Sequence, residues 1–200
     1  MILKEEVGKG IDLVARFLRD QKFLDKANWS DIKRGWIYEA VVPYTAERPL
    51  DFFVPDPSNP QVGTISTSNG IFNPKTVQKA VFELKQRKVC IITNDEMCQD
   101  KAVYDITVAP IYGVYEDDQQ QSWYTEALND EHPFYTYLEK TITGMECVVD
   151  LSNTMTINKS MLLKDKYDMT HRMSQVEECI GYCFSLGLYK KKQAAEEDAG

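Results

Sequence analysis

Cysteine and histidine are the first residues in this chain to consider as metal ligands or nucleophiles. The five cysteines are scattered, and the two histidines, His132 and His171, lie far apart. Cys179 and Cys183 are four residues apart and share a face of either a strand or a helix, but no CxxC, HxxxH or HExxH sequence accompanies them. A structural zinc site needs about four ligands. We therefore predict buried structural thiols and no metal site.

The sequence patterns that usually mark nucleophilic catalysis or phosphate binding are missing from the chain. It contains no GxSxG, no GxxxxGK[ST] and no GxGxxG sequence, and neither histidine has a Cys, Ser or Asp partner in a recognisable frame. The sequence therefore predicts no catalytic residues, no cofactor and no small-molecule substrate.

Three consecutive acidic residues, Glu116-Asp117-Asp118, offer the carboxylate oxygens that hard divalent cations prefer. The same residues end an apolar strand and stand where a helix is expected to begin. Acidic side chains at a helix N-terminus are stabilising without any metal. We interpret this run as the start of a helix.

One constellation suggests a nuclease. The sequence VPD ends at Asp56, and the sequence FELK contains Glu83 and Lys85, which together give the form PD…ExK. This form resembles the PD-(D/E)xK nuclease superfamily, in which two acids hold Mg²⁺ and the lysine assists the attacking water. The resemblance implies that Asp56 and Glu83 are the Mg²⁺ ligands and that Lys85 is the assistant. We keep a Mg²⁺-dependent nuclease as the alternative function.

The nuclease pattern conflicts with local helix signals. Its FELK sequence must lie in a strand, whereas Asn73-Pro74 is a good helix start and Val77, Val81 and Leu84 have helical spacing. These residues favour a helix that ends near residue 88.

Composition narrows the classes of partner. The chain has 200 residues and a formal net charge of −8, which disfavours a dominant nucleic-acid surface because such surfaces need Lys and Arg. Nucleic acid is therefore expected only as passing cargo. No apolar run reaches the length of a membrane span or a secretory signal, so we predict no membrane partner and an intracellular location.

The stretch Ala102–Asp118 is the clearest structural signal. Its apolar residues alternate over a dozen positions, which is typical of a long β-strand, and both faces are largely apolar, which places the strand centrally in a sheet. The other expected elements are helices over 3–21, 73–88, 123–128 and 133–143, and strands over 36–44, 89–93, 145–151 and 179–189. The order predicts an α+β fold, with a mainly antiparallel sheet and helices packed on one face.

The domain organisation is expected to be simple. Residues 1–189 are predicted to form a single domain with a long proline-rich loop over 45–73, and the charged tail 190–200 to be disordered. Apolar residues within the loop predict packing against the core or a neighbouring subunit. The candidate interface residues are Phe52, Phe53, Val54, Ile71 and Phe72.

In plan, the chain resembles the neck and tail structural proteins of tailed bacteriophages, of the tail terminator or tail completion type. The resemblance rests on the N-terminal helix, the long strand ending in Tyr115-Glu116-Asp117-Asp118, the helix after it and the closing Cys179–Tyr189 strand. It implies a non-catalytic virion subunit in a ring. Its partners would be copies of itself and other virion proteins, and it would lie in the host cytoplasm during assembly.

Overall fold

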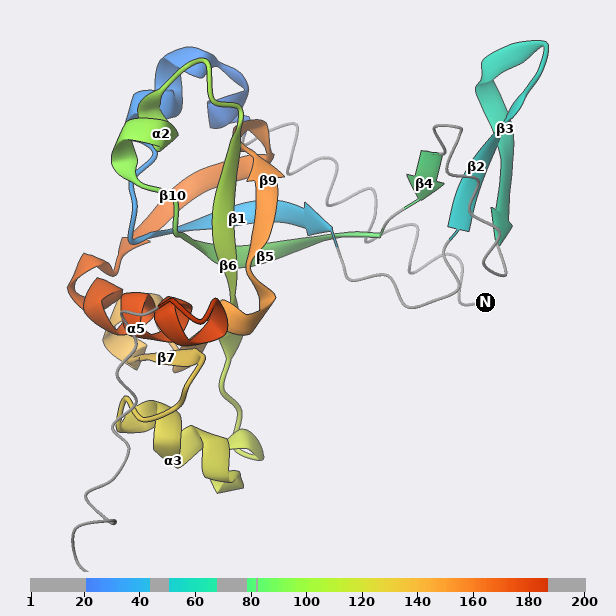
Figure 1. The fold of residues 1–200 in the computed structure, drawn as a ribbon. Helices are drawn as coiled ribbons and strands as arrows, with labels where there is room; N and C mark the ends of the chain where they lie inside the picture. The colour runs from blue at the N-terminus through green and yellow to red at the C-terminus, as the bar shows by residue number, and fades with distance from the viewer. Residues whose placement is uncertain (1–20, 44–50, 68–78, 82, 187–200) are drawn as a thin grey trace, which may run out of the picture. The chain divides into compact units, whose positions relative to one another are not determined.

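The computed structural model describes residues 21–43, 51–67, 79–81 and 83–186 (Figure 1). The chain forms two compact units, one of residues 1–40 together with 86–200 and the other of residues 41–85. Residues 3–20 of the expected N-terminal helix, Ile71, Phe72 and the expected tail over 190–200 lie outside the described residues.

The larger unit is built on a seven-stranded sheet. Its strand order is β10-β1-β5-β6-β8-β7, with β9 paired to β6 outside this path. The strands are β1 (Trp36–Pro43), β5 (Leu84–Ile91), β6 (Asp105–Gly113), β7 (Tyr135–Leu138), β8 (Cys147–Asp150), β9 (Met155–Asn158) and β10 (Leu162–Asp168). The pairings with an assigned register are antiparallel. The predicted α+β class with a mainly antiparallel sheet is confirmed.

Strand β6 lies in the middle of this sheet, as its two apolar faces predict. Val108 is opposed by Ile91 of β5 on one side and by Met155 of β9 on the other. Further along, Ile111 opposes Val149 of β8. The long strand therefore joins three neighbours and holds the two halves of the sheet together.

Short helices connect the strands. The α-helices are α2 (Asp95–Gln99), α3 (Ser122–Leu128), α4 (Lys140–Thr143) and α5 (Met173–Cys183). The 3₁₀ turns are η1 (Lys22–Leu24), η2 (Lys26–Asp31), η3 (Asp118–Gln120), η4 (Leu151–Asn153), η5 (Lys159–Met161) and η6 (Thr170–Arg172). The acidic run does begin a helical segment, because Asp118 opens η3 and accepts a hydrogen bond from the Tyr115 backbone N–H at 2.8 Å.

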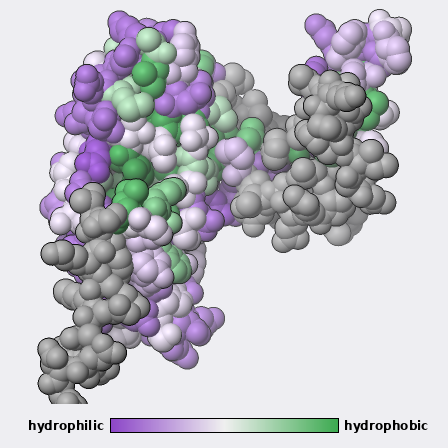
Figure 2. Space-filling view, in the orientation of Figure 1, coloured by the Kyte–Doolittle hydropathy of each residue, from purple (hydrophilic) through white to green (hydrophobic). Residues whose placement is uncertain are grey.

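The two faces of the β6-β8-β7 region carry different side chains. One face packs against α5 in a core that includes Ile111, Val149, Leu138, Val176 and Cys179. The opposite face packs Val114 and Val148 against Ala127 of α3, with five half-buried aromatic side chains around them. Figure 2 shows apolar side chains gathered over α5 on the face that it draws.

Two expected elements near the C-terminus are wrong. The expected strand over 179–189 is replaced at its start by α5, where Met173, Val176 and Cys179 recur every three residues and are buried. The expected helix over 133–143 is instead strand β7 followed by the single turn α4. Gly144 does end that turn with a left-handed φ of 82°, as expected of a helix C-cap.

The smaller unit contains a three-stranded antiparallel sheet of order β3-β2-β4, with β2 (Asp51–Asp56), β3 (Asn59–Thr67) and β4 (Lys79–Val81). The expected loop over 45–73 is therefore wrong for its described part, which forms a hairpin. Its described prolines are compatible with this, because Pro55 and Pro57 lie near the turn and Pro60 lies on the edge strand β3. The expected helix over 73–88 is also wrong, because its described residues form β4 and the start of β5.

Candidate functional site

The structure does not bring the nuclease residues together. Asp51 opposes Val81 in the antiparallel β2–β4 pair. Glu83 therefore lies beyond one end of this pair, while Asp56 lies at the other end of β2. At about 3.3 Å per residue, this register separates the two acids by roughly 20 Å. Leu84 and Lys85 do lie in a strand, as the PD-(D/E)xK pattern requires, but the two acids cannot share a metal ion in this arrangement.

Asp56 has a structural role at the hairpin turn. Its carboxylate accepts a hydrogen bond from the Ser58 backbone N–H at 2.7 Å and another from the Ser58 hydroxyl at 2.5 Å. These bonds hold the pKa of Asp56 below its ordinary value. They form an Asx turn, which aspartate commonly makes between two strands.

The candidate interface residues that the structure describes all lie on β2. Phe52 and Phe53 are half-buried, and Val54 is exposed. The Lys79 ammonium lies 5.7 Å from the centre of the Phe53 ring. These contacts are internal to the small sheet, and an interface role for the three residues stays a prediction.

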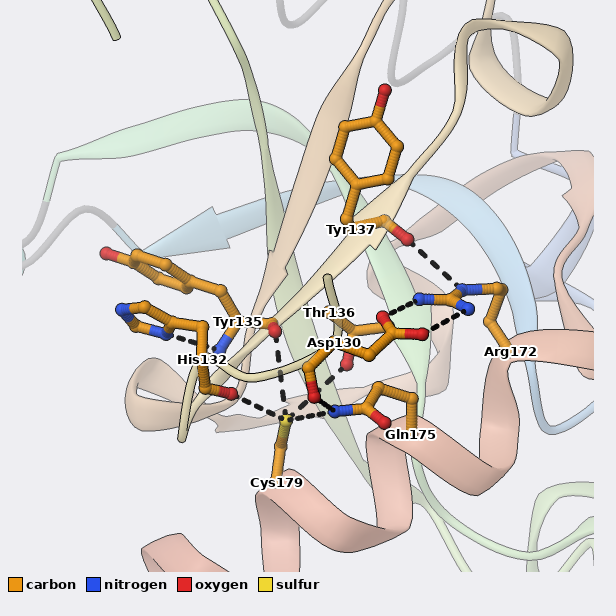
Figure 3. Close-up of polar contacts among 8 residues, drawn as sticks. All are labelled: Asp130, His132, Tyr135, Thr136, Tyr137, Arg172, Gln175 and Cys179. Carbon is orange, nitrogen blue, oxygen red and sulfur yellow. Dashed lines mark hydrogen bonds and ion pairs between the residues drawn. The ribbon is translucent and has the colours of Figure 1, made fainter. Parts of the chain in front are cut away.

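A polar cluster joins α5 to β7 around the thiol of Cys179 (Figure 3). The sulfur lies 3.7 Å from the Thr136 hydroxyl and 3.7 Å from the His132 carbonyl oxygen. Burial raises the pKa of Cys179, which disfavours the thiolate form that a nucleophilic cysteine uses. The buried side chain packs in the core between α5 and the sheet.

His132 is held as a neutral imidazole in the same cluster. Its Nδ1 accepts hydrogen bonds from the backbone N–H groups of Tyr135 at 3.1 Å and Phe134 at 3.4 Å. Its ring stacks on that of Tyr135, with centroids 4.4 Å apart. Burial lowers the pKa of His132. Because Nδ1 accepts, the single proton of the neutral ring is on Nε2, so His132 has no free nitrogen lone pair with which to act as a base.

Arg172 closes the outer edge of β7 in this cluster. Its Nε donates to the Tyr137 carbonyl at 3.2 Å, and its two terminal nitrogens bind both carboxylate oxygens of Asp130 (Figure 3). Arg172 thus donates a hydrogen bond to a backbone carbonyl on the outer edge of β7, which has no strand partner among the described residues. The contacts of this cluster connect the N-terminal part of α5 to β7 and to the segment before it.

A different arrangement lies on the opposite face of the same strands. Tyr112 on β6 opposes Val148 on β8, and Val148 opposes Tyr137 on β7. Val89 on β5 opposes Pro110, so Arg87, two residues earlier in β5, falls level with Tyr112. Directly opposed residues share a face of a sheet. The side chains therefore form a row across four strands that reads arginine, tyrosine, valine and tyrosine.

The two ends of this row carry complementary groups. The guanidinium carbon of Arg87 lies 5.0 Å from the centre of the Tyr112 ring. At the other end, the Tyr137 hydroxyl donates to Glu146 Oε1 at 2.8 Å. Glu146 Oε2 accepts from the Tyr124 hydroxyl at 3.2 Å and from Gln119 Nε2 at 3.0 Å.

We call this surface the aromatic face. Its members are all half-buried, so each is held by its neighbours and still reaches solvent. Trp123 extends it from α3 and meets the Tyr135 ring edge-on at 5.5 Å. The aromatic face consists of Arg87, Tyr112, Trp123, Tyr124, Tyr135, Tyr137 and Glu146.

The surroundings of Glu146 keep the phenols of Tyr124 and Tyr137 protonated. Burial, and then the hydrogen bond to Glu146, raises the pKa of Tyr137 well above its ordinary value. Burial and the same carboxylate raise the pKa of Tyr124. Both phenols are therefore protonated donors at neutral pH. The aromatic face thus offers one cation, one carboxylate acceptor and several phenolic donors on an apolar floor.

The residues of the aromatic face follow no sequence motif, so the sequence alone did not predict them as a site. Arg87, Tyr112, Tyr137 and Glu146 come from four separate segments, and only strand register aligns them. The one local signal was Glu146, a charged residue inside the otherwise apolar strand segment 145–149.

Among the residues that the structure describes, no group of three His, Cys, Asp or Glu side chains is placed to hold a metal ion. In the same residues, no helix has the length and apolar character needed to cross a membrane.

Comparison with known proteins gives similarity to solved structures but no match by family model or curated sequence. Among solved structures, the chain is similar to the Mycobacterium tuberculosis toxin MazF-mt6, with 22% sequence identity and a TM-score of 0.40. The match covers 51% of this chain and 89% of the toxin.

This comparison corrects the sequence-based prediction of function. The matched structure is a toxin, whereas the sequence analysis predicted a non-catalytic virion subunit of a phage neck or tail. The predictions of a virion protein and of a chain without enzymatic activity are wrong on this finding. The match itself assigns no activity to this chain, and the function proposed below is argued from the side chains of the aromatic face.

Proposed function

We propose that the chain is a ribonuclease that cleaves single-stranded RNA at the aromatic face. The observation that carries this proposal is the row of side chains across β5, β6, β8 and β7. In this row, the Arg87 guanidinium lies over the Tyr112 ring, and the Tyr137 hydroxyl donates a hydrogen bond to the Glu146 carboxylate. A nuclease was the alternative function in the sequence analysis. The residues proposed here are different from those of the PD…ExK pattern.

The aromatic character of the surface favours an unpaired strand as substrate. Unpaired bases stack on aromatic side chains, and such stacking is worth ~1–3 kcal/mol per base. A guanidinium binds phosphate oxygens in two-pronged geometry. Trp123 and Tyr135 lie on the same face as Arg87 and Tyr112, so a base and its neighbouring phosphate can be bound together.

The polar groups match the needs of RNA cleavage by its own 2′-hydroxyl. In the proposed reaction, Glu146 takes the 2′-hydroxyl proton and the 2′-oxygen attacks the adjacent phosphorus. The bond from phosphorus to the 5′-oxygen breaks, and the Tyr112 phenol gives its proton to that oxygen. Arg87 neutralises charge on the phosphate as it develops. The products are a 2′,3′-cyclic phosphate and a 5′-hydroxyl, and solvent returns the proton from Glu146 to Tyr112.

Tyr124 and Tyr137 are positioning residues in this scheme. Their hydroxyls donate to the two oxygens of Glu146 and hold the carboxylate in place. Because their pKa values are raised, they stay protonated while the carboxylate takes and releases a proton.

The test is cleavage of a labelled single-stranded RNA by the full chain, with products identified by mass spectrometry. We expect a 2′,3′-cyclic phosphate end, and no cleavage of a 2′-O-methyl RNA or of DNA with the same sequence, because both lack the nucleophile. We expect Glu146→Gln and Arg87→Gln each to lower the cleavage rate by about 10²–10⁴-fold.

A matched control separates the site from general damage. Glu177→Gln makes the same change as Glu146→Gln elsewhere in the chain and is expected to leave the rate unchanged. Cleavage of the 2′-O-methyl RNA or the DNA would refute the 2′-hydroxyl mechanism. Absence of RNA cleavage by the unmodified chain, or full activity of both site variants, would refute the proposed function.

A further inference from the structure

Strand β3 is a long edge strand without charged side chains. It runs over nine residues, Asn59–Thr67, and among the described residues it is paired with β2 alone. Natural edge strands are commonly short or carry charged side chains, which prevent further pairing. The sequence of β3, NPQVGTIST, contains no charged residue. Among the residues that the structure describes, no strand pairs with its outer edge, and no charged side chain on β3 opposes such pairing.

Apolar side chains on β3 are unusually exposed. Val62 has 58% and Ile65 has 63% of its surface in solvent, and Val54 on the neighbouring strand has 49%. Pro60 also fits an edge position, because proline has no N–H to donate to a ladder. The edge thus combines backbone groups that no described strand pairs with and apolar side chains, the two contributions used when a strand is added to a sheet.

The small sheet has little burial to hold it together. Among the side chains described between residues 51 and 85, those of Asp51, Phe52 and Phe53 are half-buried and the others are exposed. Two- and three-stranded sheets need a packed apolar face for independent stability. Pairing along β3 extends the sheet and covers part of its exposed apolar surface.

We propose that β3 pairs with β3 of a second copy of this chain, as an antiparallel strand pair about a two-fold axis. When two identical strands pair antiparallel about a two-fold axis, each copy presents the same residues to the other, so the interface is self-complementary. The whole chain carries a net charge of −8, which opposes self-association through most surfaces. The uncharged β3 edge is a segment where two copies meet without like-charge repulsion.

The interior of the hairpin explains why β3 keeps its shape when unpaired. A side chain at Gly63 would lie 2.2 Å from the Val54 carbonyl oxygen and 2.8 Å from the Phe53 ring. Glycine therefore lets β2 and its phenylalanine approach β3 closely. The strand offered to the second copy is already extended through its pairing with β2.

The experiment measures the mass of the full chain in solution over a concentration series, by sedimentation equilibrium. We expect a reversible dimer in the unmodified chain. In Val62→Lys/Ile65→Lys, which places like charges on both copies of the edge, we expect the dissociation constant to rise by at least about tenfold. Val81→Lys is the matched control, because it makes the same kind of change on β4 at the other edge of the sheet, and its dissociation constant is expected to stay unchanged.

Hydrogen exchange locates the contact and guards against misfolding of the variants. Amide protection in residues 59–67 is expected to rise with concentration in the unmodified chain but not in Val62→Lys/Ile65→Lys. A chain that stays monomeric throughout the series would overturn the proposal. A dimer of Val62→Lys/Ile65→Lys with unchanged dissociation constant and exchange would also overturn it, because the contact would then lie elsewhere. Neither result depends on whether the chain cleaves RNA.

Discussion

The ion pair between Arg172 and Asp130 allows a quantitative test of how α5 is fastened to β7. The Arg172 fork binds both oxygens of Asp130, and its Nε donates to the Tyr137 carbonyl at 3.2 Å. The side chains are 24% and 39% exposed, so solvent screens the pair, and we assign it about 1 kcal/mol. The bond to the backbone carbonyl adds about 1 kcal/mol. Arg172→Met should therefore lower the free energy of unfolding by about 2 kcal/mol.

The substitutions at Asp130 must respect its backbone. Asp130 has a φ of 59°, in the left-handed region, where alanine adds strain of about 1–2 kcal/mol and asparagine is tolerated. Asp130→Asn is therefore the clean partner in a double-mutant cycle, because it removes the charge without new strain. Arg172→Lys keeps the charge but loses the fork, and we expect it to recover only part of the 2 kcal/mol.

The assay is urea denaturation of the four chains of the cycle, with the single variants and the double variant measured under one set of conditions. We expect a coupling energy of about 1 kcal/mol between the two sites, reduced in 1 M salt because the pair is partly exposed. A coupling energy within about 0.3 kcal/mol of zero, or an Arg172→Lys chain as stable as the unmodified one, would refute the assignment of the fork.

Three further outcomes follow from the same contacts. Because burial holds the folded-state pKa of His132 below its unfolded value, the unfolded chain takes up the proton first. Stability should therefore fall as pH drops below about 6.5, with a slope of up to ~1.4 kcal/mol per pH unit, and His132→Asn should flatten this dependence in denaturation curves at pH 7 and pH 5. Gly144→Ala should lower the free energy of unfolding by about 1 kcal/mol, because the left-handed φ of 82° strains alanine. The added methyl group meets no atom within 4 Å, so no steric clash contributes. Gly144→Asn should cost less, because asparagine tolerates this backbone, and an equal cost in urea or thermal unfolding would contradict this. In pulse alkylation of the folded chain, half-buried Cys183 should be modified before buried Cys179, and the reverse order in peptide mass spectra would exclude the present packing of α5.

The sequence predicted the elements whose periodicity was long and unbroken. Strand β6 alternates over its whole length, and its two apolar faces correctly placed it between neighbours on both sides. The acidic run after it correctly marked the start of a helical segment at η3. These elements are specified by local pattern, so they needed no knowledge of tertiary contacts.

The elements that were wrong are those in which tertiary packing decides between two patterns. Residues 179–183 alternate small and large side chains, which favoured a strand, but Cys179 and Met173 complete a helical stripe that packs on the sheet. His132 suggested a helix start before Pro133. In the structure its Nδ1 instead accepts from the backbone at the entrance to β7. The aromatic face needed three strand registers at once, and no single segment contained that information.

A net charge of −8 is compatible with the proposed ribonuclease activity if RNA binds mainly through base stacking and little through phosphate contacts. A charge of −8 argues against binding through many phosphate contacts. The aromatic face has one guanidinium, Arg87, on a surface of five half-buried aromatic rings. In the proposed activity, base stacking on these rings supplies much of the binding energy, and stacking is available to every base of a flexible unpaired strand. We therefore expect short, unpaired RNA segments as the substrate of the proposed activity, because they need few phosphate contacts.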